Sequence, residues 1–472
     1  MEKIKFIDTV IENKKDIFIK ASDTIWENPE LYFNEKNSSK IIMDILKKEN
    51  FDVKDSIDNI PTAFIGSFGS GKPVIAILGE FDALPGLSQV ANLAEKKELV
   101  INGAGHGCGH HALGIGSLAG AIAVKRYLEE NNLSGTIRYY GCPAEEIGWS
   151  KMFLVKDGYF SDVDAAITWH PSSMNRVQGS STLANLCAYF SFTGKAAHAA
   201  AAPHLGRSAL DACELMNVGV NYLREHIIPE AKIHYAYLDV GGEAPNVVQS
   251  HSCLKYFIRA PKIKQVLEIA ERVKKIAKGA ALMTETIENI NFTAGMCDFI
   301  PNGIISNIMT ESLFEIGVPN FDEEDISTAQ LFFNTFSQDE INSSLKRMSE
   351  SYDNVENFKN CPLIKEISNF KRSNNCGFGS TDVGDVSYCV PTAQLQLSSF
   401  ANGTPAHSWQ ATAQGKTNAM HKSLLTAGKI LALTAIKLLE NPIILKEAKN
   451  EYIKETGGKY ICPVSQDTKP IF

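Results

Sequence analysis

The chain has 472 residues, 44% of them hydrophobic and 21% charged, which is typical of a globular protein with two or three domains. Aspartate and glutamate (54) outnumber lysine and arginine (46), so the net charge is −8, and we expect neither a nucleic-acid partner nor a membrane partner. No apolar run is long enough to span a bilayer without polar interruption. Ten cysteines without a regular spacing, and an N-terminal sequence unlike a signal peptide, predict reduced thiols and a cytoplasmic location.

The first part of the chain alternates helices and strands. Apolar residues at helical spacing predict a helix over Lys3–Asn28, ended by Pro29. Continuous apolar runs predict buried strands at residues 73–78, 136–140 and 163–169. The repetition of strand, loop and helix predicts an α/β fold with an open, mostly parallel mixed sheet flanked by helices.

Four side chains that suit metal or acid–base chemistry directly follow these predicted strands: Asp82, Glu145, Glu146 and His170. Ligands of open α/β sheets bind just outside the carboxyl ends of the strands. We therefore expect the four side chains to converge on one site.

The stretch Gly105–His111 is the densest cluster of potential metal ligands, with three histidines and a cysteine among three glycines. An extended backbone would project Cys108 and His110 to the same side. Thiolate and imidazole are preferred ligands of borderline transition metals, so a metal site is the first hypothesis. A glycine-rich turn before a helix, or a cysteine nucleophile with a histidine base, remains an alternative.

The adjacent pair Glu145-Glu146 suggests a division of labour, because neighbouring side chains point in different directions. One carboxylate could bind metal while the other takes a proton from the attacking water. An isolated acidic pair is more often a solvated one, but the position between Pro143 and Gly148 at a strand end favours the site.

From about Thr182 the pattern changes to a βαββαβ order. It comprises strands at 186–192, 233–240, 252–259 and 286–292, with helices at 208–224 and 266–276. We predict a small domain over residues 182–294 inserted into a first domain made of residues 1–181 and 295–472. Arg259 and Asn246 are suited to gripping a carboxylate, although either residue alone is more typical of a surface or a turn.

In the last part of the chain, residues 320–375 predict helices joined by surface loops. A strand is expected at 392–397 and a closing helix at 421–439.

Several motifs together resemble the M20 family of dinuclear metallopeptidases and amidohydrolases, in the branch with aminoacylase-type and indole-acetyl-amino-acid hydrolases. The resemblance extends over nearly the whole chain. It is carried by Asp82–Pro85, His106–His110, Pro143–Glu146, His170, Gly194–His198, Asn246–Val248 with Arg259, and Pro405–Ser408.

The resemblance implies specific roles. Two divalent metal ions, Mn²⁺ or Zn²⁺, would be held by Cys108, His110, Glu146, His170 and His407. Glu145 would be the general base, and Asp82 would orient a ligand from behind the site. His198 would enter the active site of a partner subunit and stabilise the oxyanion. Asn246 and Arg259 would hold the substrate carboxylate.

The implied activity is hydrolysis of the amide bond of an N-acyl or N-aroyl amino acid, with p-aminobenzoyl-glutamate, cleaved to p-aminobenzoate and glutamate, as the expected substrate. The inserted domain would act as a lid and as the dimerisation surface of a homodimer. Alternatives are a broader aminoacylase or dipeptidase, a low-activity partner in a hetero-oligomer with a paralogous subunit, and a cysteine hydrolase that uses Cys108.

Two residues depart from the family pattern. His111 stands where members of this branch commonly carry aspartate, and Glu80 stands where other M20 enzymes place a ligand histidine. Either could alter the surroundings of the metals or act as a further ligand.

Overall fold

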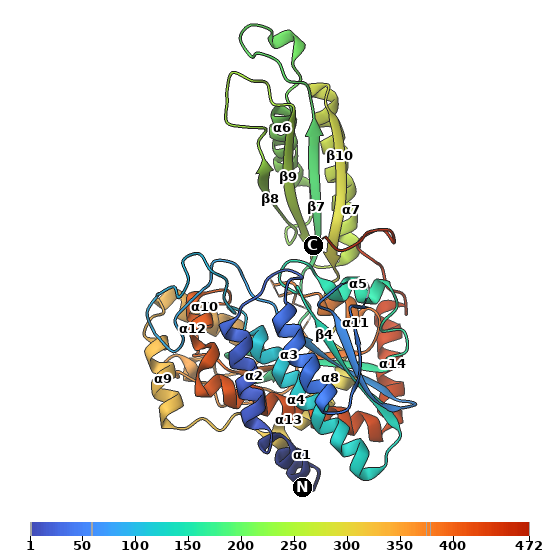
Figure 1. Cartoon of the computed structure of the whole chain (residues 1–472), viewed down its shortest axis with the longest axis vertical. Coiled ribbons are helices and arrows are strands. Elements are labelled where there is room, and N and C mark those ends of the chain that lie inside the picture. The colour runs from blue at the N-terminus through green and yellow to red at the C-terminus, as the bar shows by residue number, and fades with distance from the viewer. Residues whose placement is uncertain (1, 58–59, 374, 378, 472) are drawn as a thin grey trace.

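The computed structural model describes residues 2–57, 60–373, 375–377 and 379–471. Its elements form a larger unit with a smaller one standing on it (Figure 1). The larger unit has strands β1 (Asp52–Asp55), β2 (Phe64–Ser70), β3 (Val74–Glu80), β4 (Gly135–Cys142), β5 (Ala165–Ser172), β6 (Arg176–Val177) and β11 (Thr392–Ser398). Its helices are α1 (Glu2–Glu12), α2 (Lys15–Glu27), α3 (Lys36–Lys48), α4 (His110–Asn131), α5 (Ser150–Lys156), α8 (Gly303–Ile316), α9 (Glu323–Phe333), α10 (Gln338–Met348), α11 (Val383–Ser387), α12 (Trp409–Ala413), α13 (Asn418–Glu440) and α14 (Pro442–Thr456).

The larger sheet is mixed, with the strand order β1-β2-β4-β3-β5-β11-β6. Its four central strands, β4, β3, β5 and β11, run parallel, whereas β1, β2 and β6 are antiparallel to their neighbours. Every residue of β3 is buried, as expected for a strand covered on both faces. The predicted α/β architecture with a mostly parallel mixed sheet is confirmed.

Helices α4 and α13 cover one face of this sheet. Almost all of α4 is buried, because it lies between the strands and α13. The two helices approach closely at Gly428, where a Cβ atom would lie 2.9 Å from the Cβ of Ala119 and 3.0 Å from the carbonyl oxygen of Gly116. The rigid packing of α4 fixes its N-terminal residue, His110, at the carboxyl edge of the sheet.

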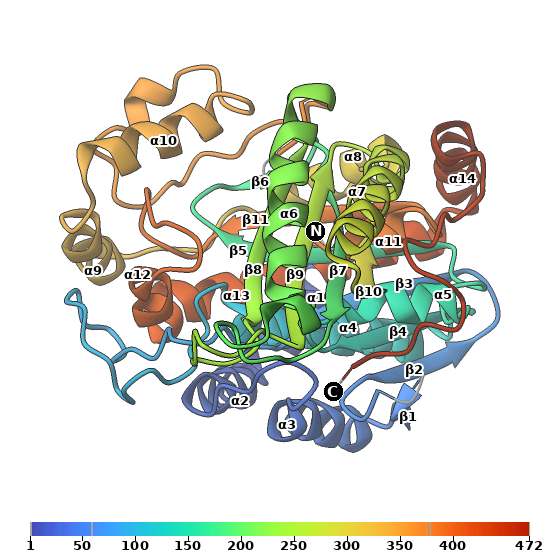
Figure 2. The ribbon, with the colours of Figure 1, turned by 90° about the horizontal axis from the view of Figure 1, so that it is seen from above.

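The smaller unit is a four-stranded antiparallel sheet with two helices on one face (Figures 1 and 2). Its elements are β7 (Ala184–Thr193), α6 (Ala209–Leu223), β8 (Lys232–Asp239), β9 (His251–Ala260), α7 (Ile263–Thr284) and β10 (Ile287–Met296), in the strand order β10-β7-β9-β8. Its apolar core continues into the layer between the larger sheet, α5 and α11. The two sheets therefore share one contiguous core at their junction.

Three features differ from the sequence prediction. The single helix predicted over Lys3–Asn28 is two helices, because the chain turns at Asn13 and Lys14 before α2 begins. The strands β1 and β2 were not predicted, since β1 is only four residues long and largely exposed, and β2 ends in glycine and serine. No helix among the described residues is both long and apolar enough to cross a membrane.

Candidate metal centre

Five potential metal ligands meet at the carboxyl edge of the larger sheet. Cys108 lies in the loop before α4, and His110 is the first residue of that helix. Glu146 follows β4, His170 lies near the end of β5, and His407 lies between β11 and α12. These segments come from opposite ends of the chain and are brought together by the parallel order of the strands.

The donor atoms form two adjoining sets. Cys108, His110 and His170 make one set, and Cys108, Glu146 and His407 make the other, with all donor atoms of a set within 4.8 Å of one another. The Sγ of Cys108 lies 3.4 Å from Nε2 of His170, and Oε2 of Glu146 lies 3.4 Å from Nε2 of His407. Since Cys108 belongs to both sets, the arrangement fits two neighbouring cations.

Backbone and carboxylate acceptors fix the histidines in the tautomer that metal binding requires. Nδ1 of His110 donates to Oδ1 of Asp82 at 2.8 Å, and Nδ1 of His170 donates to the carbonyl oxygen of Pro171 at 2.7 Å. Both Nε2 atoms therefore carry free lone pairs. Nε2 of His110 and Oε1 of Glu146 are buried without a hydrogen-bond partner, so the residues present fit a bound cation.

Electrostatic strain around the donors has the same origin. Burial raises the pKa of Glu145 well above its usual range, helped by the carboxylates of Glu80 and Glu146. Burial likewise raises the pKa of Glu146 to about 7, against the opposing effect of His110. Burial and Glu146 also raise the pKa of the Cys108 thiol, so the protein alone does not favour a thiolate. A positive charge is what this cluster lacks.

The Cys108–His110 pair is formed differently from the prediction. The segment is a turn followed by a helix, not an extended strand, because Gly109 adopts the left-handed region at φ 81° and ends the loop. Two other residues at the site, Ala144 and His407, also have positive φ values of 55° and 54°. Such backbone strain is typical of residues whose side-chain direction matters for function.

Glu80 lies at the edge of the cluster and is tied to a buried lysine. Its Oε1 accepts from Nζ of Lys151 at 2.7 Å, while its Oε2 lies 3.3 Å from Nε2 of His110. Lys151 also pairs with Asp382 at 2.5 Å and is fully buried. Sequence reasoning did not find Lys151, because a single lysine in a short helix carries no recognisable signal.

His111 does not point to the metal centre. Its Nε2 donates to the carbonyl oxygen of Gly415 at 2.8 Å, and its ring lies 5.0 Å from that of His106. Burial lowers the pKa values of both rings, to about 3 for His106. His111 is therefore a neutral packing residue and not a further ligand.

A buried glutamate, Glu35, holds the loop that carries the Glu145-Glu146 pair. Its Oε1 accepts from the backbone N–H groups of Phe33 and Ala144, at 3.0 and 3.1 Å, and its Oε2 accepts from the hydroxyl of Thr62 at 3.1 Å. Burial and the nearby Asp82 raise the pKa of Glu35 to about 8.

Glu35 is expected to make stability depend on pH. Between its ordinary pKa of 4.5 and the raised value of about 8, the folded state holds a proton that the unfolded state releases. The free energy of unfolding should therefore fall as pH rises through this window, by roughly a few kcal/mol. A Glu35→Gln variant should flatten this dependence, as measured by urea denaturation at pH 5, 6.5 and 8. An unchanged slope would contradict the assignment.

Asp82 should control metal affinity. It accepts from His110 through Oδ1 and from the backbone N–H of Glu146 through Oδ2 at 2.9 Å, so it aligns one ligand from each of the two sets. An Asp82→Asn variant should bind metal about 10- to 100-fold more weakly, as measured by competition with a chromogenic chelator. An equal loss in Asp211→Asn, an exposed aspartate on α6, would show that the effect is not local.

The three expected residues of the smaller unit lie in two places. Arg259 is at the junction, where its Nη1 donates to Oγ of Ser380 at 3.4 Å. His198 and Asn246 are exposed, and their loops are joined by a hydrogen bond from Ala199 N to the Asn246 carbonyl oxygen at 2.9 Å. The loop carrying His198 forms the end of the smaller unit farthest from the larger sheet (Figure 1). The chain by itself does not bring these two residues to the metal centre.

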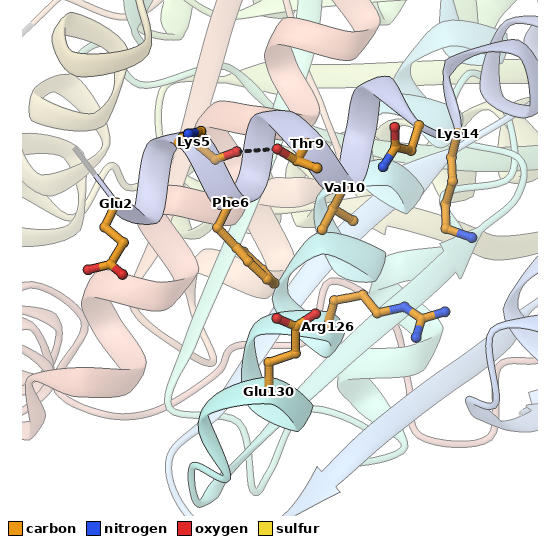
Figure 3. Close-up of a pocket in the computed structure, with 9 residues that line it drawn as sticks. Glu2, Lys5, Phe6, Thr9, Val10, Lys14, Arg126 and Glu130 are labelled. Carbon is orange, nitrogen blue, oxygen red and sulfur yellow. Dashed lines mark hydrogen bonds between the residues drawn. The ribbon is translucent and has the colours of Figure 1, made fainter.

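A separate cavity of about 460 Å³ lies between α1 and the end of α4 (Figure 3). It is lined by Phe6 and Val10 and by charged groups that include Lys14, Arg126 and Glu130. None of the metal-ligand candidates lines it.

The fold and the site together define a metal-dependent hydrolase with a dinuclear centre. The chain belongs to peptidase family M20/M25/M40, whose family model matches residues 76–388.

Among known proteins, the chain is 42% identical to one of the named subunits of the p-aminobenzoyl-glutamate hydrolase of Escherichia coli over 475 aligned residues, which cover 99% of both chains. Solved structures with the same fold include a dinuclear metal-binding M20 peptidase of Bacillus subtilis, with a TM-score of 0.55 and 17% identity, covering 91% of this chain and 99% of that one. An aminobenzoyl-glutamate utilization protein of Klebsiella pneumoniae has a TM-score of 0.58 and 15% identity, with coverage of 90% and 98%.

Proposed function

We propose that the protein hydrolyses the amide bond of N-aroyl amino acids, with p-aminobenzoyl-glutamate as its substrate and p-aminobenzoate and glutamate as products. The observation that carries the proposal is the two-cation donor set around Cys108, found in a chain closely similar over its whole length to a hydrolase of that substrate. We propose Mn²⁺ or Zn²⁺ as the metals, because sulfur, imidazole and carboxylate ligands occur together.

Two cations held by Cys108, His110, Glu146, His170 and His407 would polarise the amide carbonyl and acidify the attacking water. Glu145 accepts the proton of that water and then delivers it to the nitrogen of the leaving amine. Its burial and raised pKa support this role, since they make the protonated form accessible near neutral pH. Arg259 and Asn246 bind the carboxylate of the amino acid.

The smaller unit would act as a lid and as a dimerisation surface. Strand β8 is at the edge of its sheet, and exposed apolar side chains cover this region: Val218 and Tyr222 on α6, Tyr235 and Leu238 on β8, and Val240. An unpaired edge strand with apolar neighbours supports a homodimer. In such a dimer the exposed His198 of one protomer would complete the site of the other. The ten cysteines are free in the structure, which supports a reducing, cytoplasmic location.

A hydrolysis screen with metal-defined protein tests the proposal. We expect the highest kcat/KM on p-aminobenzoyl-glutamate, and lower values on N-acetyl amino acids and on dipeptides. A preference for N-acetyl amino acids or dipeptides would indicate the broader aminoacylase or dipeptidase instead.

A second candidate is favoured by the name of the Escherichia coli relative, which describes that protein as one subunit of a hydrolase. In that case the purified protein alone would turn over little substrate and would gain activity when a paralogous subunit is added. Mixing the two purified chains before the same assay separates the candidates.

A further inference from the structure

A row of polar side chains crosses the carboxyl edge of the larger sheet beyond the metal centre. His170 on β5 is in register with Gln396 on β11, and Gln396 is in register with Arg176 on β6. Paired residues on neighbouring strands project to the same face of a sheet. With strands about 4.8 Å apart, the backbone of Arg176 lies roughly 10 Å from that of the metal ligand His170.

Arg176 has no ionic partner in the described part of the chain. Its Nε donates to Oε1 of Gln396 at 2.7 Å and its Nη1 donates to Oγ of Ser351 at 2.5 Å, both neutral acceptors. Burial lowers its pKa, and the nearby Arg347 adds to this effect, while Tyr352 and Glu350 oppose it. Arg176 is nevertheless only partly covered, so a ligand can reach it.

Other arginines in the protein show what a structural arginine does here. Arg138 forms two bonds of 2.6 Å to the carboxylate of Asp162, and Arg372 pairs with Glu451 at 2.7 Å. A half-buried guanidinium that is held in place by neutral groups and left without an anion is suited to bind one.

Arg259 shares this property on the other side of the cleft. Its contact with Ser380 is neutral, its Nε is buried without a partner, and burial lowers its pKa. The site therefore has two uncompensated guanidinium groups, one on the larger sheet and one on the smaller. Glutamate carries two carboxylates, whereas a neutral amino acid carries one.

We propose that Arg176 binds the side-chain carboxylate of the substrate's amino acid and thereby selects aroyl derivatives of acidic over neutral amino acids. Gln396 and Ser351 orient its guanidinium, and Arg259 takes the main-chain carboxylate. This inference rests on the proposed function and adds a specificity-determining residue to it.

The test compares p-aminobenzoyl-glutamate with p-aminobenzoyl-glutamine, which has nearly the same shape but a neutral side chain. Arg176→Gln keeps hydrogen-bonding capacity toward Gln396 and Ser351 and removes only the charge, so a purely structural role would survive it. We expect kcat/KM for the glutamate substrate to fall about 10- to 100-fold, mainly through KM, with less than a threefold change for the glutamine substrate. Arg176→Lys should keep part of the preference.

Two further variants calibrate the result. Arg259→Ala should reduce kcat/KM for both substrates to a similar extent, because both carry the main-chain carboxylate. Arg272→Ala removes an arginine of α7 whose Nη1 donates only to the carbonyl oxygen of His226, and it should change neither substrate. Equal losses on both substrates in Arg176→Gln would overturn the inference and indicate a structural role.

Failure of the proposed function gives a different pattern, namely a wild-type protein that hydrolyses neither substrate. Calorimetric titration of metal-loaded protein with free glutamate and with free glutamine then decides the matter. Tighter binding of glutamate that is lost in Arg176→Gln would support the inference, and equal binding of the two amino acids would overturn it.

Discussion

A Glu145→Gln variant is expected to keep its metals and to lose about 10³-fold or more in kcat, because the amide cannot take the proton of the attacking water. Glu145 is buried beside the metal-ligand candidates but does not belong to either donor set that contains Cys108. Steady-state kinetics on p-aminobenzoyl-glutamate and metal analysis of the same preparation measure the two effects separately.

The matched control for this variant is Glu268→Gln, which makes the same change at an exposed position on α7 and should leave both quantities unchanged. Metal content that falls together with activity in Glu145→Gln would mean that Glu145 is a ligand. The structure offers a route to that outcome, since Glu80, His110 and Glu145 form a third group of close donor atoms.

Removal of metal is expected to abolish activity and to destabilise the fold. Without cations, the carboxylates of Glu80, Asp82, Glu145 and Glu146 remain close together around His110. A ligand present at about a thousand times its Kd contributes about 4 kcal/mol to stability, so the thermal midpoint should drop after chelation. Mn²⁺ or Zn²⁺ should restore both properties.

The same experiment separates metal catalysis from the thiol alternative. A cysteine hydrolase would survive chelation and would lose activity on brief treatment with iodoacetamide. For a metal ligand, we expect bound cations to protect Cys108 from alkylation, and chelation to expose it. Full activity of the metal-free protein would contradict the metal centre.

The architecture could be predicted because its signals are local. Buried parallel strands such as β3 are continuous apolar runs, and the residues that follow them gather at one edge of the sheet. The edge strands were missed, because β6 is two residues long and is defined only by its pairing with β11. Short edge strands take their structure from a neighbour and leave little trace in the sequence.

The site was predictable where chemistry is concentrated and not where it depends on tertiary contacts. The Cys108–His110 cluster stands out by composition, although its geometry comes from a glycine turn and a helix start. Lys151 and Arg176 have no such signal, since a single basic residue gains meaning only from the partners that folding provides or withholds. The distance of His198 from the metal centre also required the structure.

Of the four tryptophans in the chain, Trp149 has a position with a practical consequence. It lies just after the Glu145-Glu146 pair, and its ring is 5.7 Å from that of Phe257 on β9, so the indole bridges the two sheets. Any rocking of one sheet against the other must separate these rings and change the surroundings of a buried fluorophore. The protein thus contains a built-in optical gauge of its own opening, which can be followed by stopped-flow emission without attaching a dye.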